Sequence, residues 1–410
     1  MPTTIWGNRH YHFAKYLTQA GYNVKVFAAS SLHNSDENLI SNKQMFLESE
    51  FEGLSYVYVR AGNYKGNGMS RIKNMLEFSG RLRSVFKKLA RKEGRPDVLC
   101  VASPHNFVCM PSLRYSKKAK IPCIVEVADL WPESIVAYFP KFQKNPAIAL
   151  MYSLEKWMYK RADRIIFTME GGAEYICDKG WGKKIDLSKV KHINNGVNLE
   201  LFDAQAKENI VQDSDLDDET TFKIIYAGSI RHANGLGSLL DIAKFIASKN
   251  QQIKFLIWGD GDQKESLEKR AVDEQIDNVT FKGRVEKKYI PYITSKAQLL
   301  LLHYDSVYER IFKYGGSQNK FFEYLASGRP ILSDIEIGYS IISKYKAGVE
   351  VDSQNPEDIA NAIDQVLKMP IEEIEQMGKN ARAAAEDYDY KVLADKFIHV
   401  LEEMLNESKS

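Results

Sequence analysis

The sequence predicts an α/β protein built from two doubly wound domains. The chain has 410 residues, more than one hydrophobic core usually holds, and short apolar strands alternate with amphipathic helices in both halves. Hydrophobic residues make up 44% and charged residues 27%, as in ordinary globular proteins. Parallel sheets of this kind bind ligands beyond the carboxyl ends of their strands, so we expect the active site in a cleft between the two domains.

In the first half, near-continuous apolar runs are typical of buried parallel strands. The predicted strands are "YNVKVFAA", "LSYVYVR", "DVLCVAS", "CIVEVA", "RIIFTM" and "VKHIN". The predicted helices are "HYHFAKYLTQAG", "SRIKNMLEFSGRLRSVFKKLARKEG" and "NPAIALMYSLEKWMYKRAD". The last of these helices should begin with Asn145 as N-cap and Pro146 in the first turn.

The second half repeats this alternation. Its predicted strands are "FKIIYAGS", "IKFLIWGDG", "NVTFKGR", "AQLLLLHY", "RPILSD" and "AGVEVD". Its predicted helices are "GSLLDIAKFIASK", "QKESLEKRAVDEQ", "KKYIPYITSK", "SQNKFFEYLASG", "GYSIISKYK" and "PEDIANAIDQVLKM". The acidic segment 203–221 is expected to be an exposed linker or loop.

Composition also bounds the location of the protein. No apolar run is long enough to span a membrane, and the start has no signal-peptide layout. The four cysteines have no metal-ligand spacing, so we expect buried thiols, a cytosolic protein and no metal site. The cysteines are Cys100, Cys109, Cys123 and Cys177.

The segment "YGGSQNKFFEYLASGRPIL" places a carboxylate, Glu323, in a helix that otherwise seeks burial. Ser317 is the expected N-cap, and Lys320 adds a charge in the first turn, where free N–H groups favour a phosphate. A cation for a diphosphate and a carboxylate for vicinal hydroxyls would together recognise a nucleotide. A simple Lys320–Glu323 ion pair is the alternative interpretation.

Two further turns are candidate sites. In "YAGSIRHANGLGSLL", Gly228 follows a strand, and its glycines permit close backbone approach to a ligand, although an ordinary turn explains them equally well. The pattern is neither GxGxxG nor a Walker loop, which argues against NAD(P) and P-loop chemistry. His105 and Asp129 both follow strands of the first half, and for each a binding role competes with an ordinary loop or capping role.

Taken in order, these motifs resemble the retaining glycosyltransferases of family 4, in particular the branch that builds bacterial surface polysaccharides and has a "DLWP" element. The resemblance extends from about Gly7 to the last helix. The segments that carry it are "HINNGVNLELF", "EKWMYKRADRIIFTM", "YAGSIRHANGL", "NVTFKGRVEKKYIP" and "GGSQNKFFEYLASGRPIL".

The resemblance implies the GT-B fold, with two Rossmann-like domains that face a central cleft. An acceptor domain would span 1–200 and be joined by the C-terminal helix 386–410, and a donor domain would span 201–385. Glu323 matches the second glutamate of the family's E-x7-E element, which holds the donor ribose. Lys320, Asp129 and His105 are the candidate catalytic residues, although neither Asp129 nor His105 is assigned as a base. The implied donor-site and interdomain residues also include Gly228, Ser229, Arg231, Asn234, Gly283 beside Arg284, Gly315, Gly316, Ser317, Asn195 and Gly196.

The sequence departs from the family at several positions. Gly315 stands at the first glutamate of E-x7-E, so backbone N–H groups of 315–317 are expected to hold the transferred sugar. Ser229 and Asn234 replace a common Arg and Lys, which leaves Lys320, helped by Arg231, as the phosphate ligand. Only "MPTTIWG" precedes the first helix, where the family has a strand, so we expect either a start further upstream or a truncated first domain.

The implied reaction moves a hexose or N-acetylhexosamine from a nucleotide-sugar, with UDP as the expected nucleotide, to a saccharide or polyprenyl-diphosphate-linked acceptor in capsule, lipopolysaccharide or exopolysaccharide synthesis. No metal or other cofactor is expected. A nucleotide-sugar epimerase and a non-catalytic scaffold of the same fold are the alternatives.

A basic segment suggests a further partner. Between Arg60 and Lys120, fifteen Lys and Arg residues stand against three acidic ones. The helix around 71–92 is expected either to pack an apolar stripe on the sheet with solvated charges outside or to dock on an anionic membrane, making the protein peripheral to it. Nucleic acid is the weaker alternative, because the segment lacks interleaved aromatic residues.

Overall fold

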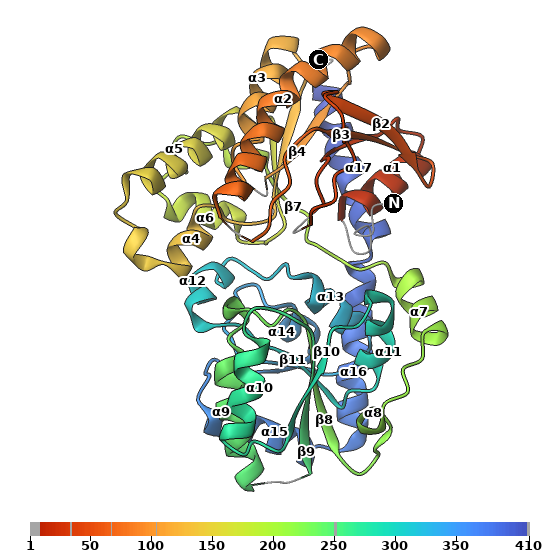
Figure 1. The fold of residues 1–410 in the computed structure, drawn as a ribbon, viewed down its shortest axis with the longest axis vertical. Coiled ribbons are helices and arrows are strands. Elements are labelled where there is room, and N and C mark those ends of the chain that lie inside the picture. The colour runs from red at the N-terminus through yellow and green to blue at the C-terminus, as the bar shows by residue number, and fades with distance from the viewer. Residues whose placement is uncertain (1–8, 33–34, 67, 104, 250–251, 408–410) are drawn as a thin grey trace. The chain divides into compact units, whose positions relative to one another are not determined.

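The computed structural model describes residues 9–32, 35–66, 68–103, 105–249 and 252–407. Their contacts divide the chain into two compact units (Figure 1). Unit 1 comprises residues 1–194 and 393–410, and unit 2 comprises residues 195–392. The question of a strand before the first helix falls on residues 1–8, which lie outside the described residues.

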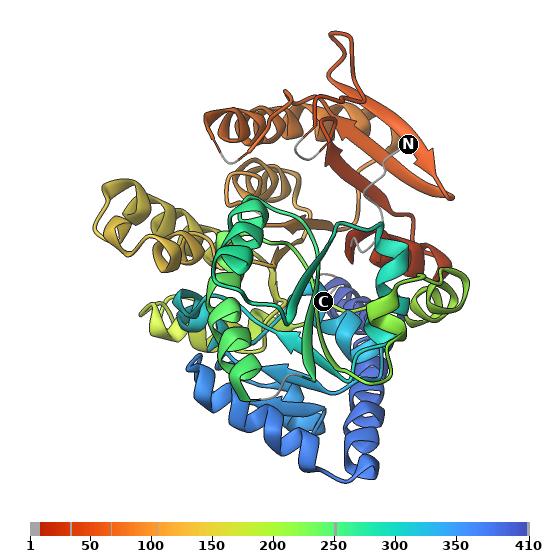
Figure 2. The same cartoon turned by 60° about the horizontal axis from the view of Figure 1, so that its bottom comes forward.

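Unit 1 contains two sheets in its described part, with strand orders β1-β3-β2 and β4-β5-β6-β7. All their neighbouring strands are parallel except β2 and β3, which form an antiparallel hairpin (Figure 2). The strands are β1 (Lys25–Ala29), β2 (Phe46–Phe51), β3 (Leu54–Val59), β4 (Leu99–Ala102), β5 (Cys123–Val127), β6 (Arg164–Phe167) and β7 (Val190–His192).

The helices of unit 1 follow the predicted alternation and add elements that the sequence patterns did not reveal, among them an 11-residue helix at Cys109–Ala119. As predicted, Asn145 caps α5, because its side chain accepts a hydrogen bond from the N–H of Ala147 at 2.8 Å. The elements are α1 (Arg9–Gln19), α2 (Met69–Glu93), α3 (Cys109–Ala119), α4 (Glu133–Tyr138), η1 (Pro140–Phe142), α5 (Pro146–Arg161), α6 (Gly172–Asp178), η2 (Leu187–Lys189) and α17 (Tyr390–Glu407), whose first residues belong to unit 2.

Unit 2 is a doubly wound domain around one six-stranded parallel sheet of order β10-β9-β8-β11-β12-β13. Its central strands are mostly apolar, with one lysine each in β8 and β9, as expected for a sheet that is covered on both faces. The strands are β8 (Phe222–Ala227), β9 (Ile253–Trp258), β10 (Val279–Gly283), β11 (Leu299–Leu302), β12 (Ile331–Ser333) and β13 (Gly348–Glu350).

The helices of unit 2 form two groups, and Figure 1 shows α10 and α16 on opposite sides of the central strands. One group, α9 (Leu236–Lys249), α10 (Lys264–Asp273) and α15 (Pro356–Lys368), packs together, and α16 (Ile371–Asp387) contacts α13 (Asn319–Ala326) and α14 (Ile341–Tyr345). The remaining elements are α7 (Leu199–Glu208), α8 (Ser214–Asp217), η3 (His232–Asn234), η4 (Lys287–Tyr289), α11 (Ile290–Ser295), η5 (Ser306–Tyr308) and α12 (Glu309–Phe312).

Two expectations about local structure are wrong. The acidic segment 203–221 is not simply an exposed linker, because it contains the end of α7 and all of α8. Lys282 of β10 anchors it through ion pairs to Asp213 at 2.7 Å and Asp215 at 2.6 Å. Of the four cysteines expected to be buried, Cys100 and Cys177 are exposed.

The described residues contain no helix that is long and apolar enough to cross a membrane.

Candidate active site

The start of α13 is the predicted anion site, and its cap differs from the prediction. The helix begins at Asn319, so Gln318 rather than Ser317 occupies the cap position, and its side chain makes no capping hydrogen bond. Gly315 has φ +111°, a conformation that a residue with a side chain adopts only with strain. The turn before α13 therefore depends on glycine.

Asn195 connects this turn to the start of unit 2. The side-chain nitrogen of Asn195 donates hydrogen bonds to the carbonyl oxygen of Ser317 at 3.3 Å and to the side chain of Asn319. Its side-chain oxygen accepts a hydrogen bond from the Tyr390 hydroxyl at 2.9 Å. Gly196, the next residue, is buried. Asn195 thus orients the chain just before α13, a role that its position in the sequence did not specify.

Lys320 lies in an aromatic cage beside the end of β8. Its ammonium group is 4.3 Å from the ring centre of Tyr226 and 4.0 Å from that of Tyr304. It donates hydrogen bonds to the Tyr226 hydroxyl and the His303 carbonyl oxygen, both at 3.3 Å. Burial of the ammonium group lowers the pKa of Lys320 to about 7, and the nearby Asp334 opposes this shift only in part. An anion bound here would stabilise the charged form.

Glu323 has a different partner from the one that the sequence suggested. Its carboxylate forms an ion pair with Lys287 of η4, with 2.6 Å between Nζ and Oε1, and it does not pair with Lys320. The Glu323 side chain is 18% exposed, so the carboxylate remains accessible at the surface of unit 2. The predicted Lys320–Glu323 ion pair is therefore wrong, and the first turn of α13 keeps its lysine directed to the end of β8.

The glycine turn after β8 lies beside Lys320. A Cβ atom at Gly228 would lie 3.0 Å from the Tyr226 hydroxyl and 3.4 Å from Cδ of Lys320. Ser229 and Asn234 hold the turn internally through a 2.9 Å hydrogen bond between their side chains. Arg231 is exposed. The structure therefore brings Gly228 and Lys320 together, as expected for two parts of one site.

The turn after β10 belongs to the same edge of the sheet. The carbonyl oxygen of Gly283 accepts a hydrogen bond from the N–H of Gly259 at 2.9 Å, and a Cβ at Gly259 would collide with the carbonyl oxygen of Gly228. Arg284 follows and leads into η4, which carries Lys287. The ends of β8, β9 and β10 thus pack closely at this edge.

A buried His303–Asp334 pair supports the site and escaped the sequence analysis. Both side chains are fully buried, and Nδ1 of His303 contacts the Asp334 carboxylate. Nε2 of His303 lies 2.9 Å from the carbonyl oxygen of Gly235, at the end of the glycine turn. Burial lowers the pKa of His303, but the charge and hydrogen bond of Asp334 outweigh it and raise the pKa. A histidine and an aspartate at the ends of neighbouring strands were the available signal.

The candidates of unit 1 form a separate cluster. His105 is buried beside Phe107, and Phe107 contacts Trp131 with 5.6 Å between ring centres. Burial, reinforced by the charge of Arg71, lowers the pKa of His105 to about 4, so this imidazole is neutral at pH 7. Its burial distinguishes it from an exposed loop histidine, and a role in binding stays a prediction.

The charge of Arg71 acts on Asp129 as well as on His105. The Asp129 side chain reaches solvent, yet the surrounding protein raises its pKa, while Arg71 acts in the opposite direction. The charge of Arg71, which lies at the start of α2 within the predicted basic helix, thus lowers the pKa of both His105 and Asp129. Such an arrangement could bind a polar ligand that carries negative charge.

Two family models match the chain. Residues 7–201 match the family described as Glycosyltransferase Family 4, and residues 207–384 match Glycosyl transferases group 1. The chain belongs to the family 4 glycosyltransferases. This family 4 glycosyltransferase is therefore an enzyme that transfers a sugar from a nucleotide-sugar donor.

Individual relatives are distant in sequence but similar in fold. The family 4 glycosyltransferase is 22% identical over 337 residues to a probable glycosyltransferase, WbjE, of Pseudomonas aeruginosa. The matched region covers 78% of each chain. Sucrose-phosphate synthase from Thermosynechococcus elongatus superposes with a TM-score of 0.71 at 18% identity, over 97% of this chain and 93% of that one. The E. coli trehalose-6-phosphate structure bound with UDP-2-fluoro glucose also gives 0.71, at 11% identity, over 97% and 96%. The fold is GT-B.

Proposed function

We propose that this enzyme is a retaining transferase that uses a UDP-sugar and binds it on unit 2. The observation that carries the proposal is the position of Lys320, which lies in the first turn of α13 and contacts the end of β8 beside Gly228. The diphosphate would bind Lys320 and the glycine turn, and the ribose hydroxyls would bind Glu323 one turn further along the helix. The similarity in fold to a structure that holds a UDP-sugar supports uridine as the nucleoside.

Charge on the leaving diphosphate is the main electrostatic demand of this reaction. Lys320 and the N–H groups at the start of α13 would stabilise it, which needs no metal ion. In a front-face transfer, the bond from the anomeric carbon to the diphosphate breaks, the acceptor oxygen bonds to that carbon, and the leaving phosphate takes the acceptor proton. A protein base is then unnecessary, which is consistent with Gly315 in place of a carboxylate.

The acceptor is proposed to be a saccharide, carried on a polyprenyl diphosphate and destined for a surface polysaccharide. Arg71, His105 and Asp129 of unit 1 are its proposed contacts, because they combine a cation, a neutral imidazole and a carboxyl group. The similarity to the probable glycosyltransferase WbjE supports the transferase activity in general.

The proposal is tested by incubating the protein with radiolabelled UDP-sugars, with and without lipid-linked acceptors extracted from membranes. Label that moves to lipid only when acceptor is present supports a transferase. Conversion of the UDP-sugar to an isomer without acceptor would identify an epimerase instead. Nucleotide binding without any product from the whole donor panel would favour a non-catalytic scaffold.

We also infer that α2 docks on an anionic membrane. The predicted apolar stripe divides in two: Leu82, Val85, Phe86 and Leu89 are buried, whereas Ile72 and Leu76 are 40% and 52% exposed. Met69, which precedes the predicted stripe, is 77% exposed. Spacings of three and four residues place these three exposed residues on one helix face, next to exposed basic residues such as Lys73. Each basic side chain near an anionic surface contributes about 1 kcal/mol.

Flotation with vesicles tests this docking. The protein should float with vesicles that contain phosphatidylglycerol at low salt, and high salt or the double variant Ile72→Ser, Leu76→Ser should release it. Equal flotation with neutral phosphatidylcholine vesicles, or none with either lipid, would contradict the docking.

A further inference from the structure

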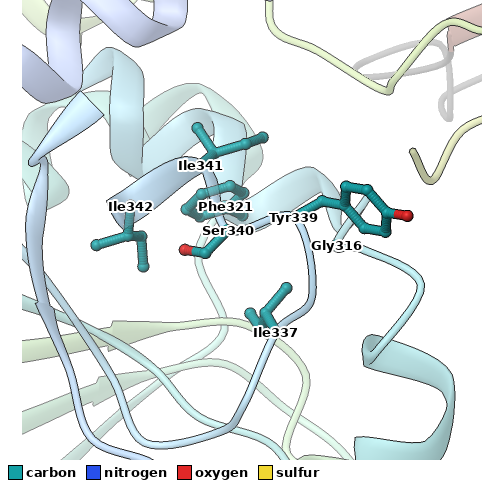
Figure 3. Close-up of a pocket in the computed structure, with 7 residues that line it drawn as sticks. All are labelled: Gly316, Phe321, Ile337, Tyr339, Ser340, Ile341 and Ile342. Carbon is teal, nitrogen blue, oxygen red and sulfur yellow. The ribbon is translucent and has the colours of Figure 1, made fainter. Parts of the chain in front are cut away.

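A small apolar hollow opens beside Gly316, in the turn that leads into α13. It is small, with about 10 Å³ of accessible space, and it opens to solvent at its mouth (Figure 3). It is formed entirely by unit 2, between the turn before α13 and the segment between β12 and α14. The lining residues are Gly316, Phe321, Ile337, Tyr339, Ser340, Ile341 and Ile342.

The walls of this hollow offer few polar partners. Phe321, Ile341 and Ile342 are buried apolar side chains, and Figure 3 shows Ile337 below them in the view. The hydroxyl of Ser340 is already engaged, because it donates to Glu350 and accepts from the N–H of Ser343 at 3.2 Å. A sugar hydroxyl placed here would lose its water without a replacement partner, which is unfavourable, whereas a methyl group would gain contacts.

A polar atom without a partner lies at the edge of the hollow. The side-chain oxygen of Gln318 is shielded from solvent and has no hydrogen-bond partner among the described residues. It lies 3.0 Å from the point where Gly316 would carry a Cβ, and Cγ2 of Ile337 lies 3.5 Å from the same point. A carboxamide therefore stands directly beside an apolar wall.

This pairing of groups complements an acetamido group. An N–H donor would satisfy the Gln318 oxygen, and the attached methyl group would enter the space lined by the isoleucines. Gly316 matters because a side chain there would approach Gln318 and Ile337 and narrow the entrance. Buried acceptors that lack a partner are uncommon, so this one calls for a ligand or a water molecule.

We propose that the sugar transferred by this enzyme is a 2-acetamido sugar, whose acetamido group binds Gln318 and the hollow beside Gly316. The inference rests on the proposed donor site: a diphosphate on Lys320 directs its attached sugar towards the turn 315–317, which immediately precedes α13. It also accounts for Gly315, because a sugar held through its acetamido group needs no carboxylate at that position.

Calorimetry with matched donors tests the proposal. UDP, UDP-N-acetylglucosamine and UDP-glucose are titrated into the whole chain, and the galactose pair of donors is measured in parallel. We expect at least one acetamido donor to bind about tenfold or more tighter than its hydroxyl counterpart. One extra apolar group together with a satisfied hydrogen bond accounts for a difference of this size. Gln318→Leu should reduce this ratio several-fold, whereas Gln376→Leu, on the exposed face of α16, should leave it unchanged.

The outcomes separate this inference from the function on which it rests. If UDP binds but both hydroxyl donors bind as tightly as their acetamido counterparts, the acetamido site is wrong and the donor site stands. An acetamido preference that Gln318→Leu leaves intact would also overturn the assignment of Gln318. If UDP itself does not bind to protein with a normal circular dichroism spectrum, the proposed donor site and this inference both fail.

Discussion

Lys287 Nζ lies 2.6 Å from Glu323 Oε1, so the carboxylate proposed to bind ribose is paired with a cation from the segment after β10. The Lys287 side chain is 39% exposed, and ion pairs this accessible are typically worth only 0.2–1 kcal/mol. Ribose hydroxyls can therefore share or replace the lysine at little cost, and the pair does not by itself explain the position of Glu323.

Variants of the two partners distinguish a structural ion pair from a ligand site. Lys287→Met should change the Kd for UDP by no more than about fivefold, as expected for loss of an exposed pair. Glu323→Ala should weaken UDP binding far more, because it removes hydrogen bonds to the ribose. Equal effects of the two substitutions in calorimetry would mean that Glu323 acts only through Lys287.

Binding of a nucleotide-sugar should depend on pH through Lys320. Its pKa of about 7 in the free protein would rise when a diphosphate binds, so the protein takes up a proton on binding. Affinity for a UDP-sugar should then fall between pH 7 and 8.5 by up to about tenfold per pH unit. UDP-sugars suit the measurement because they lack the terminal phosphate group that titrates near pH 6.

The Lys320→Met variant provides the control for this pH profile. It should bind UDP-sugar weakly at pH 6.5 and show little change up to pH 8.5. A wild-type Kd that stays constant across this range would show that the charge of Lys320 does not contribute to donor binding.

The stability of unit 1 should depend on a buried ion pair at the start of α1. Arg9 donates to the Glu126 carboxylate at 2.8 Å and to the carbonyl oxygen of Ile193 at 2.9 Å, and both side chains are almost fully buried. Among the described residues, Arg9→Met leaves Glu126 with His10 as its one ionic partner, so the free energy of unfolding should fall by about 3–5 kcal/mol. Lys65→Met, which removes an exposed pair with Asp36, should cost less than about 1 kcal/mol.

The same pair predicts a pH dependence. Burial would raise the pKa of Glu126, but Arg9 and His10 together lower it to about 2. Because the folded-state pKa lies below the unfolded value, this contribution is present above about pH 4 and is lost as pH falls towards 2. Urea denaturation between pH 7 and 3 should show the Arg9→Met deficit shrinking with falling pH, and a constant deficit would contradict this account.

The two-domain fold and the outline of the proposed donor site follow from local sequence patterns. Apolar runs such as that of β9 have no amphipathic alternative, and Asn145 followed by Pro146 determines where α5 begins. The strand β2 was not predicted, because "FLESEF" at the edge of a sheet buries too little to show a strong pattern.

Partners that are distant in sequence account for most of what the patterns missed. Nothing near Glu323 indicates Lys287, because their contact depends on how η4 returns to the edge of the sheet. The burial of His303 and Asp334 likewise requires β11 and β12 to lie side by side. The hollow beside Gly316 combines two segments whose approach only the folded chain determines.

Titration of UDP into the wild-type chain and into Glu323→Ala tests whether the donor site lies at α13. Glu375→Ala, on the exposed face of α16, is the matched control. We expect clear binding of UDP to the wild type and to the control. The affinity for UDP should fall about tenfold or more in Glu323→Ala, because hydrogen bonds to a charged group are removed. If folded wild-type protein binds neither UDP nor GDP, or if Glu323→Ala binds UDP as tightly as the wild type does, the donor site does not lie at α13.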